Sequence, residues 1–107
     1  MATQHPTSDE RCGLPAAVID DLLADETRRI ALRILAEHGE PMVVEPLARA
    51  VVAEQDDCAE AAVSAAAREI VREELFTEHL PKLTATGVVE YDSMLGTVDL
   101  KLPEILE

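Results

Sequence analysis

The 107-residue chain has almost no aromatic side chains, with one Phe, one Tyr and no Trp. The apolar residues, 48% of the total, must therefore build a core from Ala, Val, Leu and Ile. No apolar run approaches the roughly 20 residues of a membrane span, and the N-terminus lacks the pattern of a secretory signal. We expect one cytoplasmic domain with a single modest core.

Patterns typical of metal sites and catalysis are also missing. Cys12 and Cys58 are isolated and show no C-x-x-C spacing, which favours two free thiols over a disulfide or a metal site. There is no nucleophile beside a base, no phosphate-binding glycine loop and no carboxylate–histidine cluster. His79, a lone histidine near a helix end, is expected to be either a packed, hydrogen-bonded residue or a charge at the helix C-terminus rather than a ligand. We therefore expect neither an enzyme nor a cofactor.

Basic residues are scarce, since nine face 22 acidic ones and the net charge is −13. This balance argues against a polyanionic partner at ordinary salt, because DNA-binding domains usually carry a basic footprint. An acid-rich, lysine-poor composition is also typical of proteins from salt-accumulating organisms. At ~1 M salt the Debye length is only about 3 Å, so the net charge of the chain matters little beyond the first contacts. A halophilic origin is our hypothesis.

Apolar periodicity predicts a mainly helical first half. Residues 1–13 are polar and aperiodic, which indicates a flexible tail. A first helix is expected over 15–24 and a second over 25–38, capped by an aspartate at its start and a glycine after its end. Residues 42–44 could pair as a small strand. A third helix is expected over 45–54.

The fourth helical region begins near Cys58 or Ala59 and changes its apolar face along its length. Its early stripe consists of Val63, Ala66, Ala67 and Ile70, and its later one of Phe76, Leu80 and Leu83. A shift of this kind means that the two halves pack against different partners or that the helix bends. Pro81 supplies a cause for a bend, because it lacks a backbone donor and crowds the preceding turn.

The run from Glu78 to Leu100 reads as a helix end, a stop at Gly87, a strand, a turn and a second strand. The whole order is helix, helix, short strand, helix, helix, hairpin. This order predicts an α+β, mainly α fold: a winged helix-turn-helix over residues 14–102 with a C-terminal two-stranded β wing. Residues 103–107 would then form a C-terminal tail, and the apolar side chains of Leu102, Ile105 and Leu106 need either the core or a partner to cover them.

Two stretches support a family resemblance. They are DETRRIALRILAEHGEPMVVEPLARAVVAE (25–54) and EHLPKLTATGVVEYD (78–92). Both resemble winged-helix domains of halophilic archaea, many of unknown function, that are grouped with ArsR-like regulators. The resemblance implies a winged-helix fold, a role in transcription regulation and no known ligand. Metal-sensing relatives carry a Cys-rich helix, but residues 45–54 contain neither Cys nor His, which removes metal sensing by that site.

Seven residues are candidates for contact with double-stranded DNA. Four lie on the expected reading helix: Arg68, Arg72, Thr77 and Lys82. Three form the densest basic cluster: Arg28, Arg29 and Arg33. Arginine reads guanine and clamps phosphate. Each set also has neighbouring carboxylates, so both could instead be solvated, charge-balanced helix faces.

A regulator of this type would be a homodimer, with two reading helices about 34 Å apart. The candidate dimer residues are Val18, Leu22, Leu102, Ile105 and Leu106. The hairpin turn has no basic residue, and Met94 and Leu95 could either contact a protein or fold back. The alternative function is therefore a winged-helix protein-interaction module that does not bind DNA.

Overall fold

The computed structural model describes residues 10–11 and 13–106. The α-helices are α1 (Ala16–Ala24), α2 (Glu26–His38), α3 (Val44–Asp56), α4 (Ala65–Glu74) and α5 (Leu80–Ala85). Single turns are η1 (Glu60–Ala62), the π turn η2 (Leu75–His79) and η3 (Pro103–Leu106). The strands are β1 (Glu10–Arg11), β2 (Leu14–Pro15), β3 (Met42–Val43), β4 (Val89–Asp92) and β5 (Thr97–Leu100). The predicted α+β, mainly α class is confirmed.

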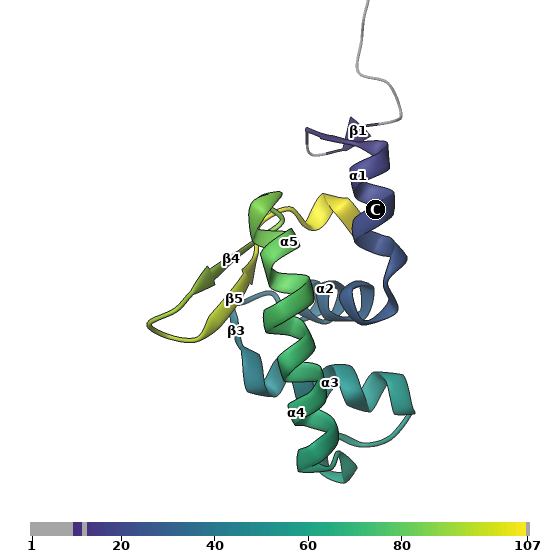
Figure 1. The fold of residues 1–107 in the computed structure, drawn as a ribbon, viewed down its shortest axis with the longest axis vertical. Helices are drawn as coiled ribbons and strands as arrows, with labels where there is room; N and C mark the ends of the chain where they lie inside the picture. Colours follow the sequence, from purple (N-terminus) through teal and green to yellow (C-terminus); the bar gives the residue numbers. More distant parts are fainter. Residues whose placement is uncertain (1–9, 12, 107) are drawn as a thin grey trace, which may run out of the picture.

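The larger sheet is antiparallel and has the strand order β3-β5-β4. Val98 at its centre pairs with Met42 on one side and with Tyr91 on the other. The short segment at 42–44 therefore adds a third strand to the predicted two-stranded hairpin. At the hairpin turn, the Asp92 carboxylate accepts hydrogen bonds from two backbone N–H groups, at 2.9 and 3.1 Å. Figure 1 shows the β4–β5 hairpin projecting from the body beside α5.

Both predicted caps of α2 are present. The Asp25 side chain accepts a hydrogen bond from the Arg28 backbone N–H at 3.0 Å, which satisfies one of the free donors at the helix start. Gly39 follows the helix with φ of 77° and donates its N–H to the Leu35 carbonyl at 3.1 Å. A residue with a Cβ would be strained in this left-handed conformation, so glycine ends the helix cleanly.

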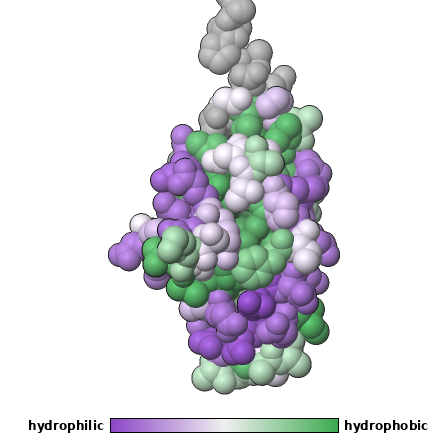
Figure 2. All heavy atoms as spheres, turned by 60° about the vertical axis from the view of Figure 1, so that its left-hand side comes forward, coloured by the Kyte–Doolittle hydropathy of each residue, from purple (hydrophilic) through white to green (hydrophobic). Residues whose placement is uncertain are grey.

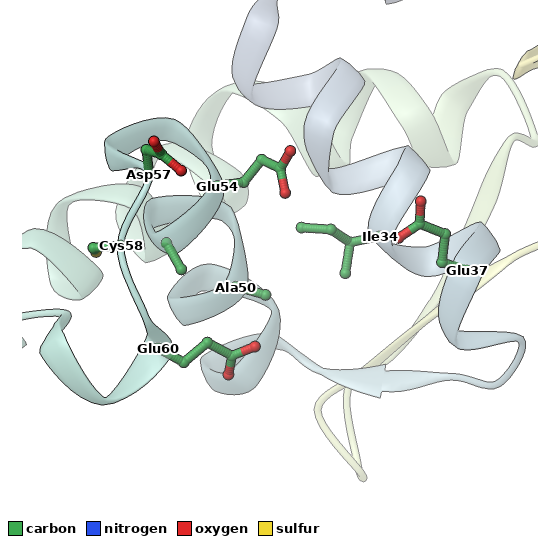
Figure 3. Close-up of a pocket in the computed structure, with 8 residues that line it drawn as sticks. Ile34, Glu37, Ala50, Glu54, Asp57, Cys58 and Glu60 are labelled. Carbon is green, nitrogen blue, oxygen red and sulfur yellow. The ribbon is translucent and has the colours of Figure 1, made fainter.

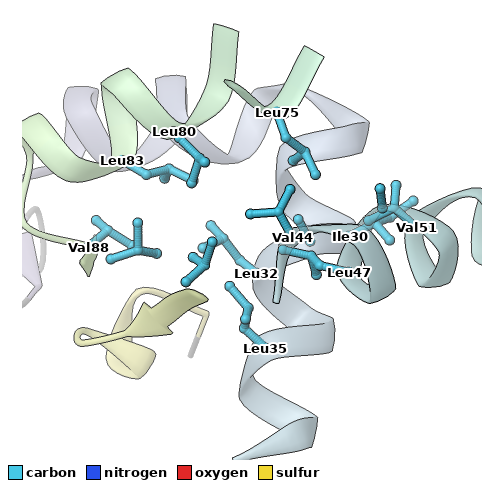
Figure 4. Packing of buried hydrophobic residues seen from close by; sticks show 14 of the residues in the cluster. Ile30, Leu32, Leu35, Val44, Leu47, Val51, Leu75, Leu80, Leu83 and Val88 are labelled. Atoms are coloured by element: carbon cyan, nitrogen blue, oxygen red, sulfur yellow. The ribbon is translucent and has the colours of Figure 1, made fainter. Parts of the chain in front are cut away.

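The core lies where α2 meets α3, the long helical segment α4–η2–α5 and the sheet. Figure 4 shows aliphatic side chains of these elements pointing toward one another. The fully buried residues of the core include Leu32, Leu47, Leu75, Leu83 and Val98. All are aliphatic, as the near absence of aromatic residues predicts.

A π turn lies between α4 and α5, where the apolar stripe was expected to change its face. The Leu80 N–H bonds to the carbonyl of Leu75, five residues back, instead of the usual four. Buried positions recur every four residues at Val71, Leu75, His79 and Leu83. An α-helix turns about 100° per residue, so side chains four residues apart lie on faces that rotate gradually around the helix. The extra residue of the π turn largely offsets this rotation, and the four side chains stay on one face.

The same spacing overturns the predicted inward position of Ile70. Its side chain is 60% exposed, because the neighbouring Val71 takes the place against the core. Both expected tails also need correction. The structured part already starts at β1, which pairs with β2, although residues 1–9 and 12 lie outside the described part of the chain. At the other end, Ile105 in η3 is fully buried, so the C-terminal segment belongs to the core.

Candidate nucleic-acid interface

Arg68 and Arg72 lie one turn apart on α4 and reach the same carboxylate on α3. Arg68 Nε is 3.4 Å from Glu45 Oε1, and Arg72 Nε is 3.2 Å from Glu45 Oε2. Glu45 stands in the first turn of α3, which packs against α4. The structure therefore brings together two of the predicted DNA-binding arginines, with a carboxylate between them.

Aromatic contacts join this arginine pair to the hairpin. The Arg72 guanidinium carbon lies 5.2 Å from the centre of the Phe76 ring, within range of a cation–π interaction. Phe76 in turn meets Tyr91 of β4 edge to face, with ring centres 5.7 Å apart. The chain's one Phe and one Tyr thus fix the position of the hairpin relative to α4.

Arg49 is a third cation near this place, and sequence reasoning missed it. It follows Glu45 by four residues and so lies on the same side of α3, one turn along. It makes no ion pair with any described residue. The four-residue spacing from Glu45 is visible in the sequence, but only the ion pairs of Glu45 with α4 show that this side of α3 belongs to the site.

The outward face of α4 differs sharply from the side that carries the arginines. Glu69, Ile70 and Glu73 are exposed there, and the Thr77 hydroxyl, also exposed, donates to the Glu73 carbonyl at 2.9 Å. Figure 2 brings the hairpin side forward and shows a strongly hydrophilic patch low on the molecule, at the level of α3 and α4. The cations thus sit on the flank of α4, while its most exposed face is acidic and apolar.

Arg28 was predicted to hold phosphate, and the structure corrects this. The side chain is 5% exposed, and its Nε and Nη2 donate to the carbonyls of Leu22 and Asp21 at 2.6 and 2.8 Å. A guanidinium bound to internal carbonyls offers nothing to an external phosphate. The residue instead ties the α1–α2 junction together.

The other three predicted cations lie apart from the Arg68–Arg72 pair. Arg29 donates to the Leu23 carbonyl at 2.8 Å, and Arg33 pairs with Glu54 near the far end of α3 at 2.7 Å. Lys82 on α5 pairs with Asp21 of α1 at 3.3 Å. No single surface collects all seven candidates.

His79 is packed and bonded inside the protein, as predicted. It is 2% exposed, with Nδ1 lying 3.4 Å from Arg28 Nη1 and Nε2 lying 3.7 Å from Asp25 Oδ1. Burial, aided by the Arg28 charge, lowers the pKa of His79, and the charges of Asp25, Glu78 and Glu74 only partly oppose it. A neutral imidazole can accept from Arg28 at Nδ1 and direct its Nε2–H toward Asp25.

The proposed dimer residues divide into two groups. Leu22 and Ile105 are buried within a single chain, so they are already covered without a partner. Val18, Leu102 and Leu106 remain partly exposed. Val18 lines a mainly apolar groove of about 350 Å³ between α1 and α5.

The hairpin tip is exposed and does not fold back. The side chains of Met94 and Leu95 are 92% and 69% exposed. Leu95 and Tyr91 also border a shallow hollow of about 560 Å³, with the carboxylates of Glu90, Asp92 and Asp99 around it. Exposed apolar side chains with a polar rim are typical of protein-contact surfaces.

A second hollow, of about 410 Å³, lies between α2, α3 and the α3–α4 connection (Figure 3). Its lining includes four carboxylates, those of Glu37, Glu54, Asp57 and Glu60, together with the free thiol of Cys58. Even so, no group of three or more His, Cys, Asp or Glu side chains in the described parts of the chain is arranged to hold a metal ion. Cys12 lies outside the described residues.

Comparison with known proteins adds a family. The family model described as "Domain of unknown function (DUF7344)" matches residues 20–99. The chain belongs to this family. No curated protein and no solved structure matches the chain. The matched range holds α2, α3, α4 and most of the hairpin. Within residues 10–11 and 13–106, none of the helices combines the length and apolarity needed to cross a bilayer.

Proposed function

We propose that this chain is a winged-helix regulator of transcription that binds double-stranded DNA in the cytoplasm of a halophilic archaeon. The observation that carries the proposal is the Arg68–Arg72 pair on the flank of α4, linked to the β4–β5 hairpin through Phe76 and Tyr91. Thr77 and Arg49 are the additional polar side chains near this surface.

The topology supports a winged helix. The elements α2, β3, α3, α4 and the β4–β5 hairpin follow in that order, and β3 pairs with β5 so that the hairpin extends from a three-stranded sheet. In helix-turn-helix proteins the second helix of the pair enters the major groove while the first touches the backbone. In this chain α4 and α3 would take these two roles.

Local charge supports contact with phosphate better than the net charge of −13 does. Arg68 and Arg72 pair with two carboxylates, Glu45 and Glu69, and Arg49 lies one helical turn from Glu45 on α3. Exposed ion pairs contribute about 0–1 kcal/mol, so a phosphate can displace them at little cost. In molar salt, charges more than about 3 Å apart are screened from each other. The charges beside the phosphate then matter more for binding than the net charge of the chain.

The test is selection of duplexes from a random-sequence pool, followed by titration of the selected duplex at about 0.15 M and at multimolar potassium chloride. Combined Arg68→Gln and Arg72→Gln substitutions should abolish binding. Combined Arg29→Gln and Arg33→Gln substitutions remove the same charge from α2 and should leave most of the affinity. Equal losses from the two double variants, or no binding by the unmodified chain in either salt, would overturn DNA binding.

A protein-interaction module without DNA binding is the second candidate. It is favoured by the exposed Met94 and Leu95 at the hairpin tip and by Ile70 between two glutamates on α4. The partner would bring apolar side chains flanked by basic ones, to match the carboxylates beside Leu95. Failure to bind any duplex in either salt is the outcome that this candidate predicts.

A further inference from the structure

Glu45 is the carboxylate that the two central arginines of the proposed interface share. One carboxylate oxygen faces the Nε of Arg68 and the other faces the Nε of Arg72, at 3.4 and 3.2 Å. Two oxygens on one centre, each facing a different guanidinium, reproduce what a phosphate group would offer. Glu69 differs, since among the described residues it pairs with Arg72 alone, and it lies on the same helix as Arg72.

The pairing with Glu45 leaves Arg68 incompletely satisfied. Arg68 Nε is the one buried side-chain nitrogen or oxygen, among the residues that the structure describes, without a hydrogen-bond partner. Its 3.4 Å separation from Glu45 is longer than the 2.7–2.9 Å that is typical of a charge-assisted hydrogen bond. A buried donor left unbonded is costly. Glu45 therefore attracts the Arg68 charge without fully meeting its hydrogen-bonding capacity.

We propose that Glu45 is an internal competitor for phosphate, which holds Arg68 and Arg72 until duplex DNA displaces it. This inference rests on the proposed DNA binding. The Glu45 side chain is 47% exposed and that of Arg72 is 35% exposed, so this ion pair is weakened by solvent and can be exchanged. Arg68 Nε is buried, but its 3.4 Å separation from Glu45 is too long for a strong bond, so Glu45 can also leave Arg68. Once displaced, Glu45 is an unpaired anion beside the DNA backbone.

Displacement of Glu45 has a consequence for salt dependence. Binding of arginines to phosphates releases cations from the duplex, which makes affinity fall as salt rises. A carboxylate freed next to phosphate takes up a cation from solution, which offsets part of that release. Glu45 therefore weakens binding in dilute salt but makes the affinity less sensitive to concentrated salt.

The chain contains a matched control for Glu45. Glu54 lies on the same helix and also pairs with an arginine, Arg33, but at the other end of α3. Glu45→Gln and Glu54→Gln remove the same charge from the same helix. A purely structural role for Glu45, such as stabilising the start of α3, would change thermal stability without changing the affinity for duplex DNA relative to the unmodified chain.

The experiment measures the Kd of the selected duplex over a series of potassium chloride concentrations. We expect Glu45→Gln to tighten binding about 3- to 30-fold in dilute salt, since the two ion pairs of Glu45 no longer compete. Its log–log salt dependence should be steeper by about one. Glu54→Gln should change the Kd less than about twofold and keep the slope of the unmodified chain.

Glu45→Asp provides a variant that keeps the charge and the interaction with the helix start. Its shorter side chain cannot bridge both arginines as Glu45 does, so binding should again tighten in dilute salt. In the free protein, the Nε–H NMR signals of Arg68 and Arg72 should move in Glu45→Gln and stay in place in Glu54→Gln.

The outcomes separate the two proposals. If the unmodified chain binds DNA but Glu45→Gln binds no tighter than Glu54→Gln, the competitor role is wrong and DNA binding stands. If the unmodified chain binds no duplex, DNA binding is wrong and the competitor role falls with it, even where a Glu45 variant binds. If no variant binds duplex in any salt, both proposals fall.

Discussion

Arg28 Nη1 lies 3.4 Å from Nδ1 of His79, and this contact joins the start of α2 to the π turn 51 residues later. Both side chains are buried, although they are polar. The other Arg28 donors reach carbonyls at the end of α1. One guanidinium therefore connects the α1–α2 junction to the long helix that carries the proposed interface.

Arg28→Met should destabilise the fold by about 2–4 kcal/mol, because it leaves buried carbonyls without their charged donor. The free energy of unfolding in urea is the measurement. Arg29→Met is the control, since Arg29 is an exposed neighbour with one bond to the Leu23 carbonyl. It should stay within about 0.5 kcal/mol of the unmodified chain. Similar losses from both variants would contradict the role given to Arg28.

Stability should fall as the pH drops below the ordinary histidine pKa of about 6.5. Burial, with help from Arg28, lowers the pKa of His79 in the folded state, so the unfolded chain binds a proton first. The contribution of His79 is therefore complete above that pH and is lost as the pH falls through the folded-state pKa. Urea titrations from neutral pH downward should show this loss, and His79→Gln should remove it. His38→Gln, at an exposed helix end, should follow the unmodified chain.

A second, more acidic loss should persist in His79→Gln. Burial raises the pKa of Asp25, but the Arg28 N–H hydrogen bond, the nearby positive charges and a second backbone bond outweigh it, and the net pKa is lowered. Asp25 therefore contributes stability above the ordinary aspartate pKa of about 3.9, and this is lost as the pH falls through the folded-state value. Asp25→Asn should reduce that acidic loss.

Phe76 and Tyr91 should be energetically coupled, because their edge-to-face contact links the π turn η2 to β4. A double-mutant cycle with Phe76→Leu and Tyr91→Leu should give a coupling energy of about 0.5–1.5 kcal/mol. The control cycle pairs Phe76→Leu with Leu95→Ala at the exposed hairpin tip and should give a value near zero. Equal values in the two cycles would mean that the ring contact does not hold the hairpin.

Much of the architecture could be predicted from local chemistry. Asp25 and Gly39 delimit α2 because a side-chain acceptor and a residue free to adopt positive φ are needed at those two points. Gly87 likewise follows the long helix with φ of 78°. Such signals depend on a few neighbouring residues, so the sequence alone reveals them.

The site was harder to predict because burial depends on packing between distant segments. Arg28 and Arg29 are adjacent and chemically identical in the sequence, and both reach carbonyls of α1, but only Arg28 is buried in doing so. Val71 is buried where Ile70 was expected, because the buried positions of the long helix recur every four residues. Arg49 gains interest only through Glu45, whose pairing with Arg68 spans two packed helices.

The π turn also fixes the direction in which the hairpin leaves the long helix. Each residue of an α-helix corresponds to about 100° of rotation, so deleting one residue between Leu75 and His79 would swing α5 and the strands after it around the axis. Phe76 would no longer meet Tyr91, and the hairpin would point away from the flank that holds Arg72. The one extra residue of the π turn thus determines the rotation of the hairpin about the helix axis relative to α4.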